Sequence, residues 1–222
     1  MLQTGKCVVF DLDGTLADTS GDLLAAANAC LRDLGAGDLL GPGDAATALR
    51  GGRAMLRLGL ARLERMDETL VDRLYPRLLE AYGAALCVHS RLYPGAAEAV
   101  EALRRQGMTA AICTNKPEGL AEALMRALGV RELFDALVGA DTLPVRKPDP
   151  APYHLAVQRA GGAARSMLVG DTETDRKTGL AAGVPVALVT FGPGDEDVAA
   201  LDPEALLHRF EDLPVLAARL LG

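Results

Sequence analysis

One segment near the start of the chain, Val8-Val9-Phe10-Asp11-Leu12-Asp13-Gly14-Thr15-Leu16, constrains the fold more than any other. Its apolar, β-branched beginning predicts a buried strand, and Gly14 predicts the turn that ends this strand. A buried strand has no structural use for two carboxylates at its carboxyl end. In open α/β sheets, however, ligands bind at that end, so Asp11 and Asp13 indicate a functional site at the edge of a sheet.

Two carboxylates at this position have a chemical interpretation. Carboxylate oxygens are ligands of Mg²⁺, which commonly also binds the phosphate oxygens of a substrate. A carboxylate can alternatively attack phosphorus as a nucleophile and form an aspartyl-phosphate. The structural alternative is a strand followed by an ordinary Asp-Gly turn, but that alternative leaves Asp11 unexplained.

Strand-like and helical patterns alternate over much of the chain. Strands are expected at Lys6–Asp11, Thr109–Thr114, Ala136–Gly139, Met167–Asp171 and Val186–Thr190. Helices are expected at Ala96–Gln106, Pro117–Leu128, Ala151–Ala160 and Thr174–Ala182. This alternation predicts an α/β fold with a Rossmann-like, doubly wound parallel sheet that is covered by helices on both faces.

The interval 17–89 interrupts the alternation, because it contains only helical patterns. One apolar stripe, which follows the capping residues Asp18, Thr19 and Ser20, consists of Leu23, Leu24, Ala27, Leu31 and Leu34. A second stripe consists of Leu70, Leu74, Leu78 and Ala81, and Pro76 within it predicts a kink or a split. We therefore expect an α/β core domain at 1–16 and 90–222, and an all-helical cap domain at 17–89 that acts as a lid over the site.

Composition limits the classes of partner. Half of the 222 residues are hydrophobic and 24% are charged, as in soluble globular proteins, and the net charge of −7 argues against nucleic acid. The residues before Lys6 lack the apolar segment of a signal peptide, and no later run reaches transmembrane length, so we expect a cytoplasmic protein without a membrane partner. Cys7, Cys30, Cys87 and Cys113 form no CxxC pair and are expected to be small buried hydrophobes.

Polar residues of complementary chemistry follow four of the strand-like or loop segments. They are Asp11 and Asp13, Thr114 and Asn115, Lys147, and Asp171 with Asp175. Taken singly, most are weak signals, since a threonine there is usually a helix cap and a lysine is usually a surface charge. Because parallel strands align their carboxyl ends at one edge of the sheet, we expect these side chains to meet there.

Each side chain can be given a chemical role. Asp11 and Asp171 would hold Mg²⁺ between the nucleophile and a phosphate, and Lys147 would offer a positive charge to a phosphoryl oxygen or to the nucleophile. Thr114 and the amides after it would bind the phosphate. Asp13 would protonate the leaving oxygen and later deprotonate the attacking water, while Asp175 would orient Lys147 or a metal-bound water.

On these residues the chain resembles the haloacid dehalogenase superfamily of phosphatases, and it matches all four motifs over essentially its full length. Several strings are similar to bacterial phosphoglycolate phosphatases: Tyr93-Pro94-Gly95, Thr114-Asn115-Lys116-Pro117, Asp141-Thr142-Leu143-Pro144, Lys147-Pro148-Asp149-Pro150-Ala151-Pro152, and Ala182-Gly183-Val184-Pro185 followed by Phe191-Gly192. The resemblance implies that Asp11 is the nucleophile and Asp13 the general acid/base. It further implies that the Asp11 carboxylate, the main-chain carbonyl of Asp13 and Asp171 bind Mg²⁺, and that Thr114, Asn115 and Lys147 bind the substrate.

The cap departs from the family pattern at one place. Where the family often has a Gly-Xaa-Gly segment, this chain reads Leu49-Arg50-Gly51-Gly52-Arg53. Arg50 and Gly51 are therefore the candidate substrate-binding residues of the cap, and Arg53 is a further cation beside them. The structural alternative is that both arginines are solvated surface charges.

The function implied is the hydrolysis of 2-phosphoglycolate or a similar small phosphorylated metabolite by a monomer or homodimer. Pyrophosphatase and sugar-phosphate phosphatase or phosphomutase activities of the same superfamily are alternatives, as is a non-catalytic binding protein. Asp13 argues against carbon–halogen hydrolysis, because the dehalogenases of the superfamily lack the second aspartate. The chain has four lysines, Lys6, Lys116, Lys147 and Lys177, and none lies in the cap. Phosphonoacetaldehyde hydrolases and hexose phosphomutases of the superfamily use a cap lysine, so the sequence favours hydrolysis of a phosphate ester.

Overall fold

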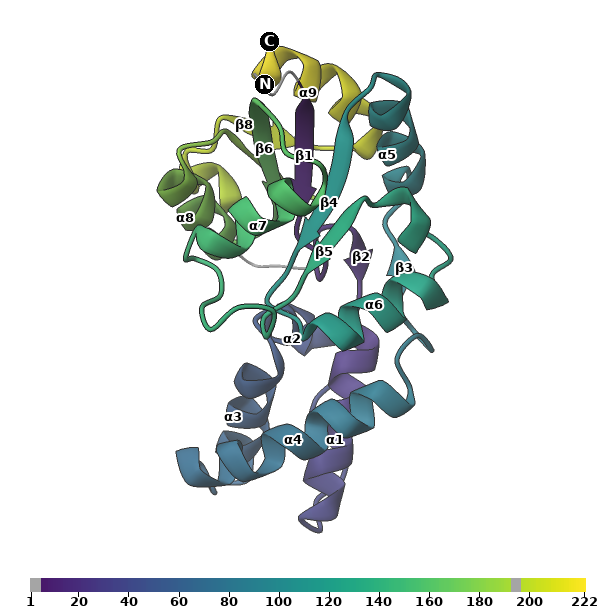
Figure 1. The fold of residues 1–222 in the computed structure, drawn as a ribbon. Helices are drawn as coiled ribbons and strands as arrows, with labels where there is room; N and C mark the ends of the chain where they lie inside the picture. Colours follow the sequence, from purple (N-terminus) through teal and green to yellow (C-terminus); the bar gives the residue numbers. More distant parts are fainter. Residues whose placement is uncertain (1–4, 193–196) are drawn as a thin grey trace. The chain divides into compact units, whose positions relative to one another are not determined.

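The computed structural model describes residues 5–192 and 197–222, and these residues form two compact units (Figure 1). Residues 5–17, 92–192 and 197–222 form the core unit, and residues 18–91 form the helical unit. The chain leaves the core unit within β2 (Ala17–Asp18) and returns within β3 (Arg91–Leu92), and these strands pair with each other. The residues before Gly5, on which the cytoplasmic expectation partly depends, lie outside the described residues.

A parallel sheet forms the centre of the core unit (Figure 1). Its strands are β1 (Lys6–Phe10), β4 (Thr109–Cys113), β5 (Ala136–Val138), β6 (Arg165–Gly170), β7 (Val186–Val189) and β8 (Ala205–Leu207). They lie in the order β5-β4-β1-β6-β7-β8, and every described neighbouring pair is parallel. The direction of winding reverses at β1, so the carboxyl ends of β4, β1 and β6 lie side by side, which is where ligands bind in such sheets.

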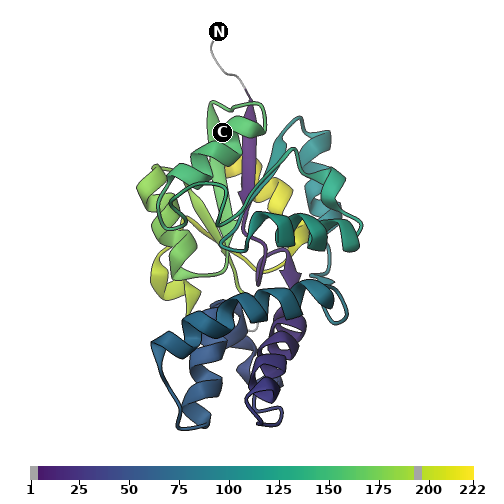
Figure 2. The same ribbon diagram turned by 60° about the horizontal axis from the view of Figure 1, so that its bottom comes forward.

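Helices cover both faces of this sheet (Figures 1 and 2). They are α5 (Ala96–Arg105), α6 (Glu118–Ala127), α7 (Ala151–Arg159), α8 (Glu173–Ala182) and α9 (Leu213–Leu221). The pair α7 and α8 packs on one face, α5 and α9 pack on the other, and α6 lies against β5. Because both faces are covered, Val8, Val9 and Phe10 of β1 are all fully buried, which explains the unbroken apolar run. The predicted Rossmann-like parallel sheet is confirmed.

The helical unit is built from α1 (Ser20–Asp33), α2 (Ala45–Leu49), α3 (Gly52–Arg62) and α4 (Glu68–Ala84). Helix α1 packs against both α3 and α4. Gly59 of α3 lies against Leu31 of α1, and a Cβ added at Gly59 would lie 2.6 Å from the Leu31 Cδ1 atom. The absence of a side chain at Gly59 therefore allows the close approach of α1 and α3.

Helix α4 does not split at Pro76, so of the kink or split predicted there, the split is wrong. The helix is continuous from Glu68 to Ala84, with Pro76 exposed in its interior. Proline removes one amide donor and crowds the preceding turn, a cost of about 3 kcal/mol. The apolar residues on either side, Leu74 and Leu78, are both buried, and their packing offsets this cost.

The four cysteines are free thiols, and three of them, Cys7, Cys30 and Cys113, are buried. Burial raises the pKa of Cys113, at the end of β4, to about 12. Since the thiolate is the reactive form of cysteine, this thiol is held in its unreactive form close to the sheet edge.

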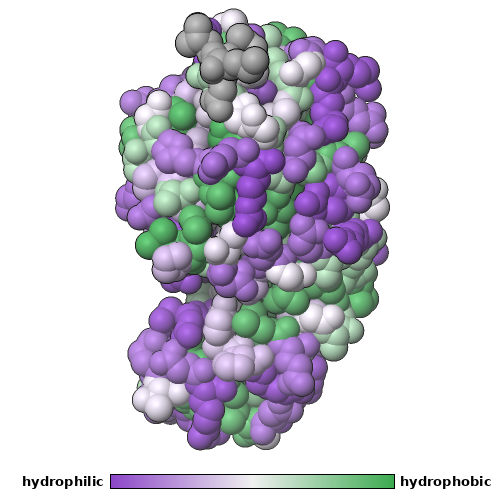
Figure 3. All heavy atoms as spheres, in the orientation of Figure 1, coloured by the Kyte–Doolittle hydropathy of each residue, from purple (hydrophilic) through white to green (hydrophobic). Residues whose placement is uncertain are grey.

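The exposed surface gives no extended apolar area among the described residues. Figure 3 shows hydrophilic and hydrophobic residues interspersed on the visible face. The large apolar residues with the highest exposure come from separate segments and are Met66, Val88, Val145, Leu180 and Val215. Single exposed apolar residues are ordinary on protein surfaces. Every helix within 5–192 and 197–222 is too short or too polar to cross a lipid bilayer.

Candidate active site

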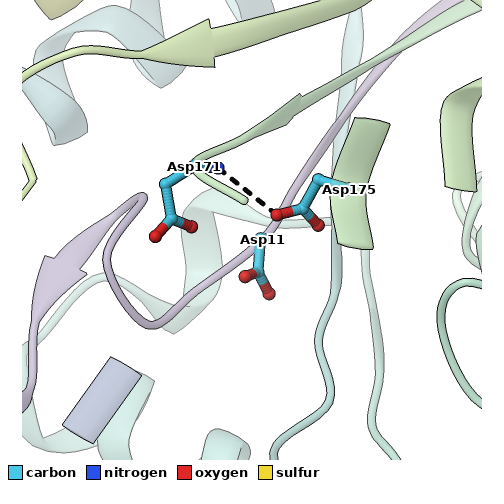
Figure 4. A group of neighbouring side chains, drawn as sticks. All are labelled: Asp11, Asp171 and Asp175. Carbon is cyan, nitrogen blue, oxygen red and sulfur yellow. Dashed lines mark hydrogen bonds between the residues drawn. The ribbon is translucent and has the colours of Figure 1, made fainter. Parts of the chain in front are cut away.

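Three carboxylates from separate segments gather at the carboxyl edge of the sheet (Figure 4). Asp11 directly follows β1, and its amide donates to the carbonyl of Val169 in β6 at 2.9 Å, so the sheet still holds this residue. Asp171 follows β6, and Asp175 lies in the first turn of α8. One oxygen of each carboxylate lies within 4.8 Å of the others.

The Asp175 side chain is fully engaged in holding its surroundings. Its Oδ2 accepts hydrogen bonds from the Asp171 and Thr172 amides at 3.3 and 3.2 Å, and from the Thr172 hydroxyl at 2.7 Å. Its Oδ1 accepts from Lys147 at 2.6 Å. A Cβ added at Gly170 would lie 2.4 Å from the Asp175 Cβ and Cγ atoms, so only glycine leaves room for this carboxylate. Both oxygens of Asp175 are therefore used to orient neighbouring groups.

Lys147 links this carboxylate to the predicted nucleophile. Its Nζ lies 2.6 Å from Asp175 Oδ1 and 2.9 Å from Asp11 Oδ1, and only the contact with Asp175 has the geometry of a hydrogen bond. The residue is 3% exposed. A buried lysine between two carboxylates is held in one place, so its positive charge stays beside Asp11.

The environment shifts the protonation of these groups. Burial raises the pKa of Asp11 to about 6, while the Lys147 ammonium opposes the shift and the Asp175 charge adds to it. Burial also raises the pKa of Asp171 well above its usual value, and the charges of Asp11 and Asp175 add to this effect. Burial opposes the charge on Lys147, but the two carboxylates outweigh it and raise the pKa of this lysine.

The donor set fits a hard divalent cation. Three carboxylates face one ammonium in a buried cluster, which leaves two negative charges uncompensated when all four groups are ionised. Asp171 Oδ1 accepts a hydrogen bond from the buried hydroxyl of Thr15 at 2.7 Å, which fixes the direction of this carboxylate. Asp11 Oδ1 is buried without a well-aligned hydrogen bond. Asp11 and Asp171 therefore offer oxygens to a cation, whereas Asp175 has both of its oxygens occupied.

Asp13 lies in a tight turn after the first strand. The carbonyl of Leu12 accepts from the amides of Thr15, Leu16 and Ala17, and the amide of Gly14 donates to Ala17 at 2.9 Å. Gly14 has a φ of 85°, a conformation that favours glycine at this position. The turn thus fixes the backbone of Asp13 immediately beside Asp11.

A residue to which the sequence patterns assigned no role, Lys116, pairs with Asp13. Its Nζ donates to both carboxylate oxygens of Asp13, at 2.8 and 3.0 Å, and its side chain is 4% exposed. The pairing joins residues 103 positions apart, and the only signal in the sequence was a lysine directly after Thr114 and Asn115.

Thr114 and Asn115 follow β4 at the same edge of the sheet. The Thr114 side chain is buried, and its hydroxyl accepts from the Lys116 amide at 3.2 Å. The Asn115 side-chain amide donates to the carbonyl of Lys147 at 3.0 Å, so it ties the loop that carries this lysine to the end of β4. The structure thereby brings the core residues predicted from the sequence to one sheet edge, while their roles toward a substrate stay predictions.

The two candidate arginines of the helical unit differ in whether their side chains already have partners within the described residues. Arg50 ends α2 and is exposed, and its side chain forms no hydrogen bond or ion pair within the described part of the chain. Gly51, with a φ of 95°, precedes α3. The Arg53 guanidinium forms an ion pair with Asp72 and lies 4.4 Å from the centre of the Tyr75 ring. Arg50 is thus the cation available to a ligand, whereas Arg53 is already engaged.

A buried aspartate after the first strand of a Rossmann-like sheet, with a lysine and further carboxylates at the neighbouring strand ends, defines a hydrolase of the haloacid dehalogenase type. The family model of the haloacid dehalogenase-like hydrolases matches residues 6–183, and the chain belongs to this family. Within the family it is a phosphatase similar to the phosphoglycolate phosphatase of Mesorhizobium japonicum, with 41% identity over 96% of both chains.

Further relatives agree with this placement. The phosphoglycolate phosphatase of Rhodospirillum rubrum is 38% identical over 94% of this chain and 89% of its own. Among solved structures, a predicted phosphoglycolate phosphatase of Haemophilus somnus superposes with a TM-score of 0.80 at 29% identity, covering 97% of this chain and 99% of its own. The resemblance to haloacid dehalogenase-type phosphatases that the motifs indicated is confirmed.

Proposed function

We propose that the protein is a magnesium-dependent phosphomonoester hydrolase that acts on 2-phosphoglycolate through an aspartyl-phosphate on Asp11. The observation that carries the proposal is the environment of Asp11. This residue is 9% exposed at the end of β1, and its carboxylate is ion-paired with Lys147 and lies beside two further carboxylates. The relatives named phosphoglycolate phosphatases, which match this chain over nearly its full length, support this choice of substrate.

The chemistry proceeds in two half-reactions. Asp11 attacks phosphorus, the bond between phosphorus and the ester oxygen breaks, and protonated Asp13 gives its proton to the leaving oxygen. A water molecule then attacks the phosphorus of the aspartyl-phosphate while the Asp13 carboxylate takes a proton from it. The bond between phosphorus and Asp11 breaks, and inorganic phosphate leaves. Both steps use Asp13 as the proton carrier, first as an acid and then as a base.

The remaining groups of the core unit hold charge in place. The Asp11 carboxylate, the main-chain carbonyl of Asp13 and Asp171 would hold Mg²⁺, which would supply positive charge to offset the repulsion between these carboxylates and an anionic ester. Lys147 adds a fixed positive charge beside Asp11, and Asp175 keeps this lysine oriented. The Thr114 hydroxyl and the amides after it donate to a phosphoryl oxygen.

The helical unit selects the substrate in this proposal and acts as the lid. The carboxylate of 2-phosphoglycolate lies at the end remote from phosphorus, and burying it requires a compensating donor. Arg50 is an exposed cation without a partner among the described residues, and the positive φ of Gly51 leaves the backbone beside it open to a ligand. These two residues would bind the substrate carboxylate.

Pyrophosphate and small sugar phosphates are the competing substrates. A phosphomutase is disfavoured, because residues 17–88 contain neither lysine nor histidine, the side chains that mutases of this superfamily use in the cap. A non-catalytic role is disfavoured, because all the required carboxylates and Lys147 are present.

A substrate panel tests the proposal. The purified protein is assayed with 2-phosphoglycolate, pyrophosphate, glucose phosphates and p-nitrophenyl phosphate, each with magnesium and after removal of metal by EDTA. We expect the highest kcat/KM for 2-phosphoglycolate, with activity lost on chelation and restored by magnesium. A higher kcat/KM for another member of the panel would reassign the substrate, and full activity after chelation would refute the role of the metal.

A further inference from the structure

The burial of Lys116 calls for an explanation. Its side chain is 4% exposed, whereas a solvated ammonium at the end of a flexible chain is the usual state of lysine. Transferring a charged ammonium out of water is unfavourable unless a partner of opposite charge compensates it. The partner is Asp13, whose side chain is 16% exposed.

The geometry of this pair restricts rotation of the Asp13 carboxylate, because both of its oxygens are bound. One ammonium donates to both oxygens, at 2.8 and 3.0 Å, so rotation of the carboxylate about its last side-chain bond would lengthen at least one contact. Carboxylate torsions of this kind are otherwise broad. The turn fixes only the backbone of Asp13. The ion pair with Lys116 additionally restricts rotation of the Asp13 carboxylate.

The backbone of Lys116 is itself held on two sides. Its amide donates to the Thr114 hydroxyl at 3.2 Å, and its carbonyl accepts from the Ala140 amide at 2.9 Å. The lysine therefore starts from a fixed point at the end of β4, and Asp13 from a fixed point after β1. A long side chain anchored in this way can position its partner.

The two buried lysines of the site divide its carboxylates between them. Lys147 pairs with Asp11 and Asp175, whereas Lys116 pairs with Asp13. Asp11 and Asp13 are therefore each paired with a different lysine, so we expect a change at Lys116 to leave the pair of Lys147 with Asp11 in place.

We propose that Lys116 is a positioning residue that holds the Asp13 carboxylate in the orientation required for proton exchange with the leaving oxygen and with water. The inference rests on the proposed role of Asp13 and adds to it a residue that acts only through Asp13. A misplacement of about 1 Å can lower a rate by roughly 10²-fold, so loss of this restraint should reduce kcat strongly. The affinity for substrate should change little, since the Lys116 ammonium already donates to both carboxylate oxygens of Asp13.

The test is a double-mutant cycle of Lys116→Met with Asp13→Asn, assayed with 2-phosphoglycolate and p-nitrophenyl phosphate. We expect Lys116→Met to lower kcat by 10- to 100-fold with KM within threefold of the original protein. In the Asp13→Asn background, the same change should lower kcat by less than threefold, because the partner is already lost. Lys177→Met, which removes an exposed lysine of α8, is the matched control and should leave both constants unchanged.

The alternatives give different results. Losses that multiply in the double variant would show that Lys116 acts independently of Asp13, and a raised KM with an unchanged kcat would show that it binds the substrate; either result overturns the proposal. If Lys116→Met does not fold, as judged by circular dichroism, Lys116→Arg replaces it. The arginine variant should lower kcat in the original background and have no further effect beside Asp13→Asn, and multiplying losses would again overturn the proposal.

The same measurements separate this inference from the proposed function. Asp13→Asn with unchanged activity would refute the role of Asp13 itself. Severe loss in Asp13→Asn together with unchanged kcat in Lys116→Met would refute only the positioning role of Lys116.

Discussion

Charged side chains are held in different ways in the core unit and in the helical unit. At the site of the core unit, Lys147, Asp175 and Lys116 are at most 7% exposed, and each is part of an ion pair. In the helical unit the ion pairs Arg32–Asp38, Arg57–Glu68 and Arg77–Asp33 join side chains that are each more than two-fifths exposed. Exposed pairs contribute about 0–1 kcal/mol, whereas breaking a buried pair costs about 3–5 kcal/mol. The buried ion pairs of the core unit therefore fix the positions of the site side chains, whereas the exposed pairs of the helical unit contribute little beyond a polar surface.

Asp22 is the exception within the helical unit. This residue of α1 is 2% exposed, and its carboxylate accepts from the His89 amide at 2.9 Å and from the Ser90 amide and hydroxyl at 2.8 and 2.7 Å. It joins the start of α1 to the segment before β3, more than sixty positions later. The Asp22 carboxylate is thus held as firmly as those of the core site.

The largest effect is expected from Asp11→Asn, which removes the charge of the proposed nucleophile but keeps its shape. Turnover of every phosphate ester should fall below detection, because uncatalysed phosphate monoester hydrolysis is extremely slow. Steady-state assays with 2-phosphoglycolate and p-nitrophenyl phosphate measure the loss. Circular dichroism should report an intact fold, and Asp38→Asn, at an exposed carboxylate of the helical unit, should retain full activity. Substantial turnover by Asp11→Asn would break the assignment of the site.

The next effect concerns stability and compares the two kinds of carboxylate inside the helical unit. Asp22→Ala should lower the free energy of unfolding by about 3 kcal/mol, since it leaves the buried amide and hydroxyl of Ser90 and the amide of His89 without their acceptor. Asp38→Ala should lower it by less than about 1 kcal/mol, because its pair with Arg32 is exposed. Urea denaturation followed by circular dichroism measures both. Equal losses would contradict the distinction between buried and exposed charge.

A smaller effect is expected at the substrate-binding residue proposed in the helical unit. Arg50→Ala should raise the KM for 2-phosphoglycolate about tenfold, which corresponds to about 1.4 kcal/mol of lost binding to a charged group. It should leave the KM for p-nitrophenyl phosphate unchanged, since that ester has no carboxylate. Arg53→Ala is the matched comparison and should have the weaker effect, because Arg53 is engaged with Asp72 and Tyr75. If both variants resemble the original protein with both substrates, substrate selection lies elsewhere.

The smallest effect is a pH-dependent stabilisation by magnesium. The raised pKa values of Asp11, to about 6, and of Asp171 mean that the folded protein binds protons more tightly than the unfolded chain. Without metal, the contribution of Asp11 to stability is therefore greatest below about pH 4 and is lost as the pH rises through about 6, and the raised pKa of Asp171 acts in the same direction. Magnesium competes with these protons, so at about five times its Kd it should raise Tm by about 2–4 °C at pH 7.5 and by less at pH 5.

Differential scanning calorimetry with and without magnesium measures these shifts, and calcium-free buffer excludes a competing ion. In the Asp171→Asn variant, which lacks one carboxylate of the cluster, the shift at pH 7.5 should be smaller. A shift of equal size at both pH values would argue that magnesium binds outside this cluster.

The sequence predicted the sheet, and the edge at which the candidate residues gather, because both depend on local patterns. Unbroken apolar runs such as Val8-Val9-Phe10 are produced by burial on both faces, and the polar residues after them stand out by contrast. Strand β8 was not predicted, since it has only three residues, of which Ala205 and Leu206 are partly exposed. Its pattern is therefore too short and too weak to recognise.

The pairing within the site could not be read from the sequence. Lys116 and Asp13 meet only because β1 and β4 are neighbours in the sheet, and no local pattern reports which lysine serves which carboxylate. The sequence also did not decide between a kink and a split at Pro76, since the packing on both sides of the proline is a property of the folded unit. Propensity describes a segment alone, whereas these features depend on its neighbours.

Gly170 lies so close to Asp175 that adding a single methyl group at position 170 would move charged groups of the site. An alanine there carries no charge and lies on a buried strand, so a substitution table would class it as mild. Yet its Cβ would occupy space that the Asp175 carboxylate now fills, and displacing that carboxylate would release Lys147 from its place beside Asp11. When variants of this enzyme are screened for altered substrates, position 170 therefore belongs with the ionisable residues to be left unchanged, although it has no side chain of its own.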